Sequence, residues 1–344
     1  MNSTSKNAPN SNGSNPSDLQ KAISHLKSGS CVAIPTETVY GLAARFDSPE
    51  GVSSIFRLKE RPSFDPLIVH VADLEQVKLL AAEWPQTAQK LAAKFWPGPL
   101  TMVVRKNADV NSMISAGLET VGIRMPRHPI ALELIRGAGP LAAPSANRFG
   151  RTSPTTAAHV VSEFPSPVAS GEILVIDGGS SDIGVESTVC LVTENAVTVL
   201  RPGGVTLEAI REEFARDPSM KAVEVSRAAA TQASPGHTEH HYETKKPLIV
   251  SWSDDLTDAS YKVSGREIAR EKIETLALSH EPTLAARSLY GLLREGDLNP
   301  ASEALFIRRD LRAEKNRGGL WSAIDDRLTR ASRLQLGSRS DSDV

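Results

Sequence analysis

Short apolar runs alternate with helical patterns along the first two thirds of the chain, and this alternation limits the fold more than any other feature. Runs of strand length lie at 31–35, 67–71, 100–105, 121–125, 140–143, 173–177, 186–192 and 196–200. Strands separated by helices favour parallel pairing, whereas strands that follow each other directly, as the last two do, favour antiparallel pairing. The pattern therefore predicts an α/β fold whose sheet is mixed and covered by helices, not a simple doubly wound sheet.

Helix boundaries are indicated by capping residues. Polar residues suited to the N-cap precede several apolar patterns, and proline and glycine end others. We predict a first helix with Ser17 as its N-cap, helices at 85–96 and 128–136, a helix that begins at Ser153-Pro154, and a helix at 206–214 after Thr206.

A change in composition after Phe214 divides the chain, whose 344 residues are enough for two domains. Residues 215–246 are polar and are predicted to be a linker over the site, between a domain at 17–214 and a smaller α/β domain at 247–336. The ends, 1–16 and 337–344, are predicted to be disordered tails. In the second domain we predict a strand at 247–252, helices near 265–278 and 282–295, a strand at 303–308, and a helix with Leu320, Ile324 and Leu328 on one face.

The overall composition excludes several classes of protein. The chain is 40% hydrophobic and 23% charged, which is the balance of a globular protein. Its net charge of -2 gives no global field that attracts nucleic acid or membranes, although this value does not exclude a local basic groove. It contains no apolar run of membrane-spanning length, and its first residues lack the apolar core of a signal peptide. Cys31 and Cys190 lie in apolar runs and are interpreted as buried thiols in a reducing compartment, so we expect a cytoplasmic protein.

Hydroxyls and cations gather where the first predicted strands end. Pro35-Thr36-Glu37-Thr38 follows strand 31–35, Lys59 and Arg61 precede strand 67–71, and Arg124 lies inside an apolar strand. Solvated surface charge is the alternative for the first pair, and a structural ion pair is the alternative for Arg124. Together these groups suit a small anionic ligand, with phosphate as the first candidate.

Further polar residues follow the later strands, although each admits a simpler interpretation. Ser145, Asn147 and Ser153 are suited to hydrogen bonds with phosphate or ribose, and turn chemistry explains them equally well. Arg201 at a strand end is weak evidence alone, and a lone histidine such as His70 is more often structural. No CxxC, Walker A, GxGxxG or Gly-x-Ser-x-Gly pattern occurs, and we predict no protein-only metal site and no catalytic serine triad.

Taken in order, these segments resemble the YrdC-type threonylcarbamoyl-AMP synthases. The resemblance runs from about Ser17 to Phe214, and a C-terminal segment containing RSLYGLLRE, together with the linker SPG…HY, resembles the long form of the family, which has an extra α/β domain. The motifs that carry it are PTETVYGL, KERP followed by PLIVH, WPGPLT, VGIRMPRHP, APSAN, SPT, IDGG, ESTV and LRPG.

The resemblance implies a fold and an activity. The fold is an open twisted α/β sheet with a basic concave face, followed by a smaller Rossmann-like domain. The activity is the synthesis of L-threonylcarbamoyladenylate from L-threonine, bicarbonate or CO2 and ATP, with release of pyrophosphate and with Mg2+ carried by the ATP. The product would pass to a threonylcarbamoyl transferase that modifies tRNAs reading codons that begin with A.

The resemblance also implies roles for individual residues. The threonine site would consist of Thr38, His70, Arg124, Ser187 and the backbone near Ala143, and Lys59 and Arg61 would be catalytic residues facing the phosphates or the carbamate. The ATP site would contain Lys59, Arg61, Asp65, Thr120, Ser145, Asn147, Ser153 and Arg201. Asp65 stands where the family often has asparagine, and Glu239 stands where the long form often has tyrosine; His237, His240 or Tyr242 would replace that tyrosine.

Two alternatives accompany this reading. The basic concavity could bind double-stranded RNA without chemistry, although the hydroxyls of PTETVYGL and ESTV have no use in that role. The C-terminal domain could be a regulatory module that anchors the linker as a lid over the active site.

Overall fold

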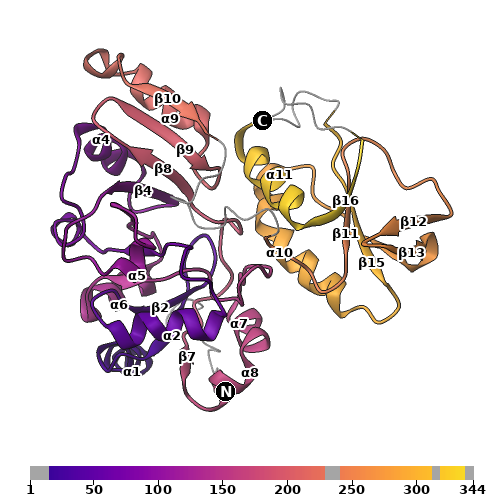
Figure 1. Ribbon diagram of the computed structural model, residues 1–344, viewed down its shortest axis with the longest axis horizontal. Coiled ribbons are helices and arrows are strands. Elements are labelled where there is room, and N and C mark those ends of the chain that lie inside the picture. The colour runs from indigo at the N-terminus through magenta and orange to yellow at the C-terminus, as the bar shows by residue number, and fades with distance from the viewer. Residues whose placement is uncertain (1–14, 229–240, 312–317, 338–344) are drawn as a thin grey trace, which may run out of the picture.

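The computed structural model describes residues 15–228, 241–311 and 318–337, which form a larger and a smaller domain side by side (Figure 1). Of the predicted tails, 1–16 and 337–344, residues 1–14 and 338–344 lie outside these residues, whereas Pro16 begins the first helix. His237, Glu239 and His240 also lie outside the described residues. None of the described helices has the length and apolar character needed to cross a membrane. Cys31 and Cys190 are both buried and unpaired, as predicted.

The larger domain follows the predicted order of strands and helices closely. Its strands are β1 (Cys31–Ile34), β2 (Gly41–Arg45), β3 (Ile68–His70), β4 (Leu100–Arg105), β5 (Thr120–Arg124), β6 (Leu141–Ala142), β7 (Ile173–Val175), β8 (Thr188–Val192), β9 (Ala196–Arg201) and β10 (Glu224–Arg227). Its helices are α1 (Pro16–Lys27), α2 (Pro49–Lys59), α3 (Leu74–Val77), α4 (Gln86–Phe95), α5 (Ser112–Ser115), α6 (Pro129–Ala138), α7 (Ala157–Glu163), α8 (Pro165–Ala169) and α9 (Leu207–Ala215), with a 3-10 turn at Pro218–Met220.

These ten described strands form one sheet in the order β10-β9-β8-β4-β5-β3-β6-β2-β1-β7. The sheet contains parallel pairs (β1 with β7, β3 with β5, β4 with β8, β9 with β10) as well as antiparallel ones, so the predicted mixed sheet is confirmed. Apolar side chains of α2 and α4 pack with the strands in the main hydrophobic core.

Two helix starts were predicted wrongly. Asn15, not Ser17, caps α1, because its side chain accepts the Ser17 N–H. No helix begins at Ser153-Pro154; α7 begins at Ala157 instead, and Thr156 caps it by accepting the His159 N–H. The hydroxyl of Ser153 is used elsewhere, in a hydrogen bond to Glu186.

The predicted linker also begins too early. β10 lies within residues 215–246 and pairs in parallel with β9, so this strand extends the large sheet. Of the remaining linker, the described residues from His241 onward run along the larger domain, where Glu243 pairs with Arg151 in an isolated bridge.

The smaller domain has a parallel sheet in the order β14-β15-β11-β16. Its elements are β11 (Leu248–Ser251), β12 (Ser260–Val263), β13 (Arg266–Ala269), a 3-10 turn at Arg270–Lys272, β14 (Ile273–Thr275), α10 (Pro282–Leu298), β15 (Ala304–Arg308), α11 (Gly319–Ala331) and β16 (Ser332–Leu336). The helix predicted near 265–278 is wrong, because this region holds the second strand of a hairpin and β14. Ser264 and Gly265, both at positive φ, form the two-residue turn typical of such hairpins.

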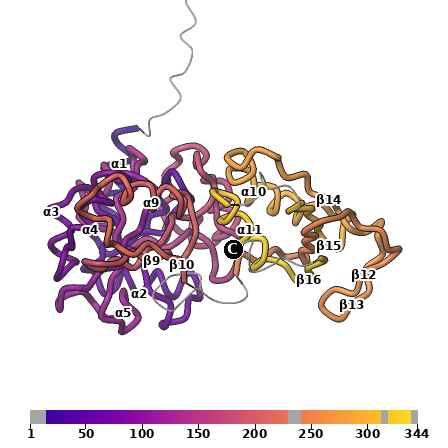
Figure 2. The backbone as a smooth tube through the Cα atoms, turned by 90° about the horizontal axis from the view of Figure 1, so that it is seen from above, coloured from indigo at the N-terminus to yellow at the C-terminus, as the bar shows by residue number. Residues whose placement is uncertain are grey.

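The domains meet through α10 and α11, which line the side of the smaller domain that faces the larger one in both views (Figures 1 and 2). The backbones of the two domains come into close contact at Gly184, just before the ESTV segment. A Cβ atom at this position would lie 2.4 Å from the Ala286 carbonyl oxygen and 2.4 Å from the Arg287 Cα, both in α10. Only glycine fits there, so α10 contacts the chain two residues before Glu186 of the ESTV segment.

Candidate functional site

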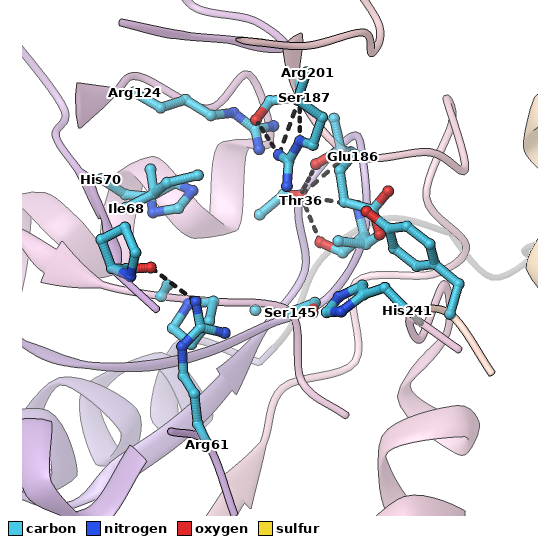
Figure 3. A pocket seen from close by; sticks show the side chains of 17 residues that line it. Thr36, Arg61, Ile68, His70, Arg124, Ser145, Glu186, Ser187, Arg201 and His241 are labelled. Carbon is cyan, nitrogen blue, oxygen red and sulfur yellow. Dashed lines mark hydrogen bonds between the residues drawn. The ribbon is translucent and has the colours of Figure 1, made fainter. Parts of the chain in front are cut away.

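One cavity gathers most of the residues that the sequence singles out (Figure 3), and about 60 Å³ of it is open to the centres of water molecules. Such a space admits a few waters or a small metabolite. It is lined by Thr36, Thr38, Val39, Gly41, Arg61, Pro66, Ile68, His70, Arg124, Ala143, Pro144, Ser145, Glu186, Ser187, Arg201, His241 and Tyr242.

The sheet creates this cavity by bringing strand ends together. β3 and β5 are parallel neighbours, with His70 paired in register with Arg124 at the end of both. β4 runs antiparallel to β5 and parallel to β8, so the residues just before β8, including Ser187, arrive at the same edge. Residues that are far apart in the sequence therefore converge because strand direction alternates across the sheet.

Arg124 is held by two partners and retains one nitrogen for a ligand. Its Nη2 donates to the Glu37 carboxylate at 2.7 Å, and its Nε donates to the Gly98 carbonyl at 3.2 Å. The second Glu37 oxygen accepts the Arg127 N–H at 3.0 Å. Burial opposes ionisation of Glu37, but Arg124 outweighs it and lowers the pKa of the carboxyl group. Within the described chain Nη1 of Arg124 has no recorded partner, so it remains a donor for a ligand.

Arg201 lies beside Ser187, on the same side of the cavity as Arg124 (Figure 3). Its Nε and Nη2 both donate to the Ser187 carbonyl, at 3.2 and 3.0 Å, and Nη2 also lies 3.3 Å from the Ser187 hydroxyl. That hydroxyl is 2.8 Å from the Thr101 hydroxyl. Two arginines near each other in the lining make the cavity suited to an anion.

Lys59 and Arg61 leave the end of α2 in different directions. Arg61 lines the cavity, pairs with Asp65 at 3.0 Å and donates to the Pro66 carbonyl at 2.7 Å. Lys59 is buried behind the wall, where Nζ donates to the Ser145 carbonyl at 2.6 Å and also to the Asn147 carbonyl. Burial, reinforced by Arg61, brings the pKa of Lys59 well below its ordinary value.

Two buried histidines add neutral polar groups. Burial, aided by Arg124, lowers the pKa of His70 to about 3, and burial likewise lowers the pKa of His241 to about 3. Both imidazoles are therefore uncharged at neutral pH. Among the described residues, Nδ1 of His70 has no hydrogen-bond partner although it is buried, and such an atom is expected to meet a ligand or water.

The other side of the cavity is closed by the turn after β1 and by the linker. Thr36 donates to the Val39 carbonyl at 2.6 Å and lies 2.9 Å from the Thr38 hydroxyl, which fixes the turn. His241 and Tyr242 of the linker, both nearly inaccessible to solvent, complete the lining. The described end of the linker thus covers the cavity.

The structure brings together nearly all of the predicted site residues. Eight line the cavity: Thr38, Arg61, His70, Arg124, Ala143, Ser145, Ser187 and Arg201. Four others contact these or other lining residues: Lys59, Asp65, Asn147 and Ser153. Thr120 lies outside the cavity, at the opposite end of β5 from Arg124, where it lines a separate hollow.

Several residues of the site were missed by sequence reasoning. Glu37 and Glu186 lie inside the quoted motifs PTETVYGL and ESTV, yet no role was predicted for them. Tyr290, which lies in the quoted segment RSLYGLLRE, and Arg327 of the smaller domain reach Glu186, and no role was predicted for either of them. Among the described residues, no group of three or more His, Cys, Asp or Glu side chains could hold a metal ion.

Fold and site define a two-domain α/β protein with a cavity that is suited to a small anionic molecule and is covered by the described end of its linker. The Sua5/yciO/yrdC family model, described as telomere recombination, matches residues 24–203, and the model for the threonylcarbamoyl-AMP synthase C-terminal domain matches residues 205–333. The chain therefore belongs to the Sua5/YrdC family, in the form that carries the additional C-terminal domain.

Named relatives agree with this assignment. The chain is 43% identical over 260 residues to the threonylcarbamoyl-AMP synthase of Pyrococcus abyssi, which covers 75% of this chain and 72% of the relative. It is 41% identical over 242 residues to that of Bacillus subtilis, covering 69% and 67% of the two chains. The crystal structure of P. abyssi Sua5 complexed with L-threonine superposes with a TM-score of 0.77 and 33% identity, over 93% of this chain and 96% of the other.

Proposed function

We propose that this protein is a threonylcarbamoyl-AMP synthase, a nucleotidyltransferase that forms L-threonylcarbamoyladenylate from L-threonine, bicarbonate or CO2 and ATP and releases pyrophosphate. The observation that carries the proposal is the convergence, in one closed cavity, of Arg124, His70 and Thr38, the residues that the family resemblance assigns to threonine. The threonine complex of the archaeal relative, which matches across both domains, supports the same ligand.

The cavity offers a partner for each polar group of threonine. The available Nη1 of Arg124 suits the carboxylate, since guanidinium groups donate charge-assisted hydrogen bonds to carboxylates. The unpartnered Nδ1 of neutral His70 suits the amine or the hydroxyl, and an uncharged imidazole does not repel an ammonium group. Thr38 and Ser187 add hydroxyls at the sides.

We assign the nucleotide to the half of the site that contains Arg61, Ser145 and Arg201, with Lys59, Asp65, Asn147 and Ser153 behind them. The cavity as described is too small for ATP, and His241 and Tyr242 cover it. Entry of ATP would therefore require this part of the linker to move away and then return. The predicted contact of Thr120 would need a nucleotide that extends along the sheet beyond this cavity.

In the proposed reaction the neutral threonine amine attacks the carbon of bicarbonate or CO2, and an oxygen of the resulting carbamate attacks the α-phosphorus of ATP. Pyrophosphate leaves with the electron pair of the broken bond. Lys59, Arg61 and Arg201 would stabilise the charge that develops on the phosphates. Enclosure by the linker would protect the carbamate from water.

Magnesium would arrive with the ATP phosphates and neutralise part of their charge. Asp65 and Glu186 are each paired with an arginine, which supports the proposal that the ion is held mainly by the nucleotide. We further propose that the adenylate passes to a threonylcarbamoyl transferase for tRNA modification in the cytoplasm.

Mass spectrometry of products from ATP, L-threonine and isotopically labelled bicarbonate tests this proposal. The wild-type protein should form labelled threonylcarbamoyladenylate, and Lys59→Ala or Arg61→Ala should abolish it while folding is retained. Lys94→Ala, a matched change of a half-exposed lysine on α4 outside the cavity, should leave turnover unchanged. Pyrophosphate release that is independent of threonine would overturn the proposal.

A further inference from the structure

Glu186 lines the cavity of the larger domain, yet the smaller domain supplies most of its partners. Its carboxylate accepts hydrogen bonds from the Tyr290 hydroxyl of α10, at 2.8 and 3.0 Å, and from the Arg327 Nε of α11, at 3.0 Å. The larger domain contributes one hydrogen bond, from the Ser153 hydroxyl at 2.5 Å. All four side chains are buried, so this contact is not a solvated surface pair.

A carboxylate in this position is unfavourable for the proposed substrates. Glu186 lies in the same cavity wall as Ser187 and Arg201, where the proposed nucleotide phosphates would bind. Burial would raise its pKa, but Arg327, Arg201 and Ser153 outweigh burial and lower the pKa to about 2, so the group is ionised at neutral pH. Unless a cation compensates it, this charge opposes the binding of phosphate at close range in a medium of low dielectric constant.

Arg327 provides that compensation from outside the catalytic domain. It is 1% exposed and also donates to the Pro202 carbonyl, so it reaches across the domain boundary into the larger domain. Its Nη2 is buried and has no partner within the described residues. A purely structural ion pair would be expected to satisfy every nitrogen of a buried guanidinium group.

The same two residues also support the part of the linker that covers the cavity. The Tyr242 ring stacks on Tyr290 with centroids 5.7 Å apart, and the Arg327 guanidinium lies 5.5 Å from the Tyr242 ring. Tyr242 has a φ of 64°, a left-handed conformation that persists only where surrounding contacts enforce it. Charge compensation and closure of the cavity therefore depend on one pair of residues in the smaller domain.

We propose that Arg327, assisted by Tyr290, neutralises Glu186 and so makes the C-terminal domain an electrostatic part of the ATP site. Arg327 and Tyr290 are positioning residues in this scheme, because they act on the nucleotide through Glu186. The inference rests on the proposed function, since it needs ATP as the ligand. It predicts that the C-terminal domain affects ATP affinity through the charge of Glu186, which a substitution can remove, in addition to its contribution to the stability of the fold.

A double-mutant cycle tests the inference in the full-length protein. ATP binding in the presence of magnesium is measured by calorimetry, and thermal unfolding is followed in parallel, for Arg327→Met, Glu186→Gln and the double variant. Arg327→Met should weaken ATP binding at least tenfold, because it leaves the Glu186 charge uncompensated. Adding Glu186→Gln should restore the affinity to within threefold of wild type, because glutamine keeps the shape and removes the charge.

Arg309→Met is the matched control. Arg309 is equally buried in the smaller domain, where its Nε donates to Asp325 at 2.7 Å, but it does not line the cavity. This change should lower the unfolding temperature and leave ATP affinity within twofold. If Arg327→Met fails to fold, Tyr290→Phe keeps the aromatic stack while removing one donor to Glu186, and it should weaken ATP binding threefold to tenfold, again with rescue by Glu186→Gln.

The outcomes separate the two proposals. Wild-type binding of ATP together with unchanged affinity in the Arg327 variant, or a double variant as weak as Arg327→Met, overturns the inference and leaves the proposed function intact. A wild-type protein that binds no ATP overturns the proposed function, and the inference fails with it. Loss of affinity that simply follows the unfolding temperature, in the control as well, assigns Arg327 a structural role only.

Discussion

Replacing Arg124 with lysine gives the sharpest test of how the cavity recognises threonine. The guanidinium group performs three tasks at once: Nη2 pairs with Glu37, Nε holds the Gly98 carbonyl, and Nη1 remains for the ligand. A lysine keeps the positive charge, but its single ammonium group cannot reproduce the planar fork. The ammonium group would remain with the buried carboxylate of Glu37, and the ligand would lose its partner.

The size of the effect follows from the one bond that is lost. A hydrogen bond to a charged group contributes about 1.5–3 kcal/mol, which corresponds to a 10- to 150-fold rise in the Kd for threonine. Folding should survive, because the 2.7 Å pair with Glu37 is replaced rather than broken. Arg124→Met is a poorer probe, since an unpaired buried carboxylate would cost roughly 3–5 kcal/mol of stability.

Calorimetric titration with L-threonine is the assay, and Arg105→Lys is the control. Arg105 lies on the neighbouring strand β4, where it forms an exposed pair with Glu83 outside the cavity, so its replacement should leave the Kd unchanged. Arg124→Lys should also bind ATP within twofold of wild type when threonine is absent. Wild-type threonine affinity in Arg124→Lys would refute the assignment of Nη1 to the carboxylate.

Three further predictions follow from burial and packing. In the unfolded chain His70 takes up a proton near pH 6.5, whereas in the folded protein it stays neutral down to about pH 3, so its contribution to stability is retained above pH 6.5 and lost below it. Denaturation curves should show that the free energy of unfolding falls by about 1.5 kcal/mol for this group between pH 6.5 and about pH 5. A His70→Gln variant whose free energy of unfolding depends on pH as steeply as that of wild type would contradict this. Gly184→Ala should loosen the domain interface, because its Cβ would lie 2.4 Å from backbone atoms of α10. Limited proteolysis should then separate the domains faster than in wild type, and equal rates of cleavage would disprove the packing argument. Lys59→Met should abolish adenylate formation and should keep or raise the unfolding temperature, because it removes a buried amine whose pKa already lies well below its ordinary value. A marked drop in the unfolding temperature would show that Nζ of Lys59 mainly stabilises the fold.

Local sequence signals predicted most secondary structure of the larger domain. The cap at Thr206 and the stop at Pro97 placed α9 and α4 within a residue or two. The failures have causes that the structure identifies. Ser153-Pro154 has the pattern of a helix start, but the hydroxyl is drawn into a contact with Glu186 from a distant segment. The hairpin turn at Ser264-Gly265 falls at the start of the helix predicted near 265–278, and strands occupy that region instead.

The residues of the candidate site were likewise predicted in part from the sequence and in part missed. Arg61, His70, Arg124 and Ser187 belong to motifs whose order along the chain identified them, and the sheet brings them into one cavity. Thr120 belongs to the same strand as Arg124, but a strand of five residues carries its two ends far apart. Residue order alone could not show which end of β5 faces the ligand.

The sequence by itself determined the mixed α/β class, the division into two domains and the kinds of side chain at the site, because periodicity, caps and motif order are local properties. Only the tertiary structure decided which partner each charge has. Lys59 is buried behind the cavity wall, and Arg124 pairs with Glu37 of the PTET turn. Glu186 pairs with Arg327 from the other domain. These pairings join residues up to 141 positions apart, and chain direction and domain packing, not local sequence, bring such residues within hydrogen-bonding distance.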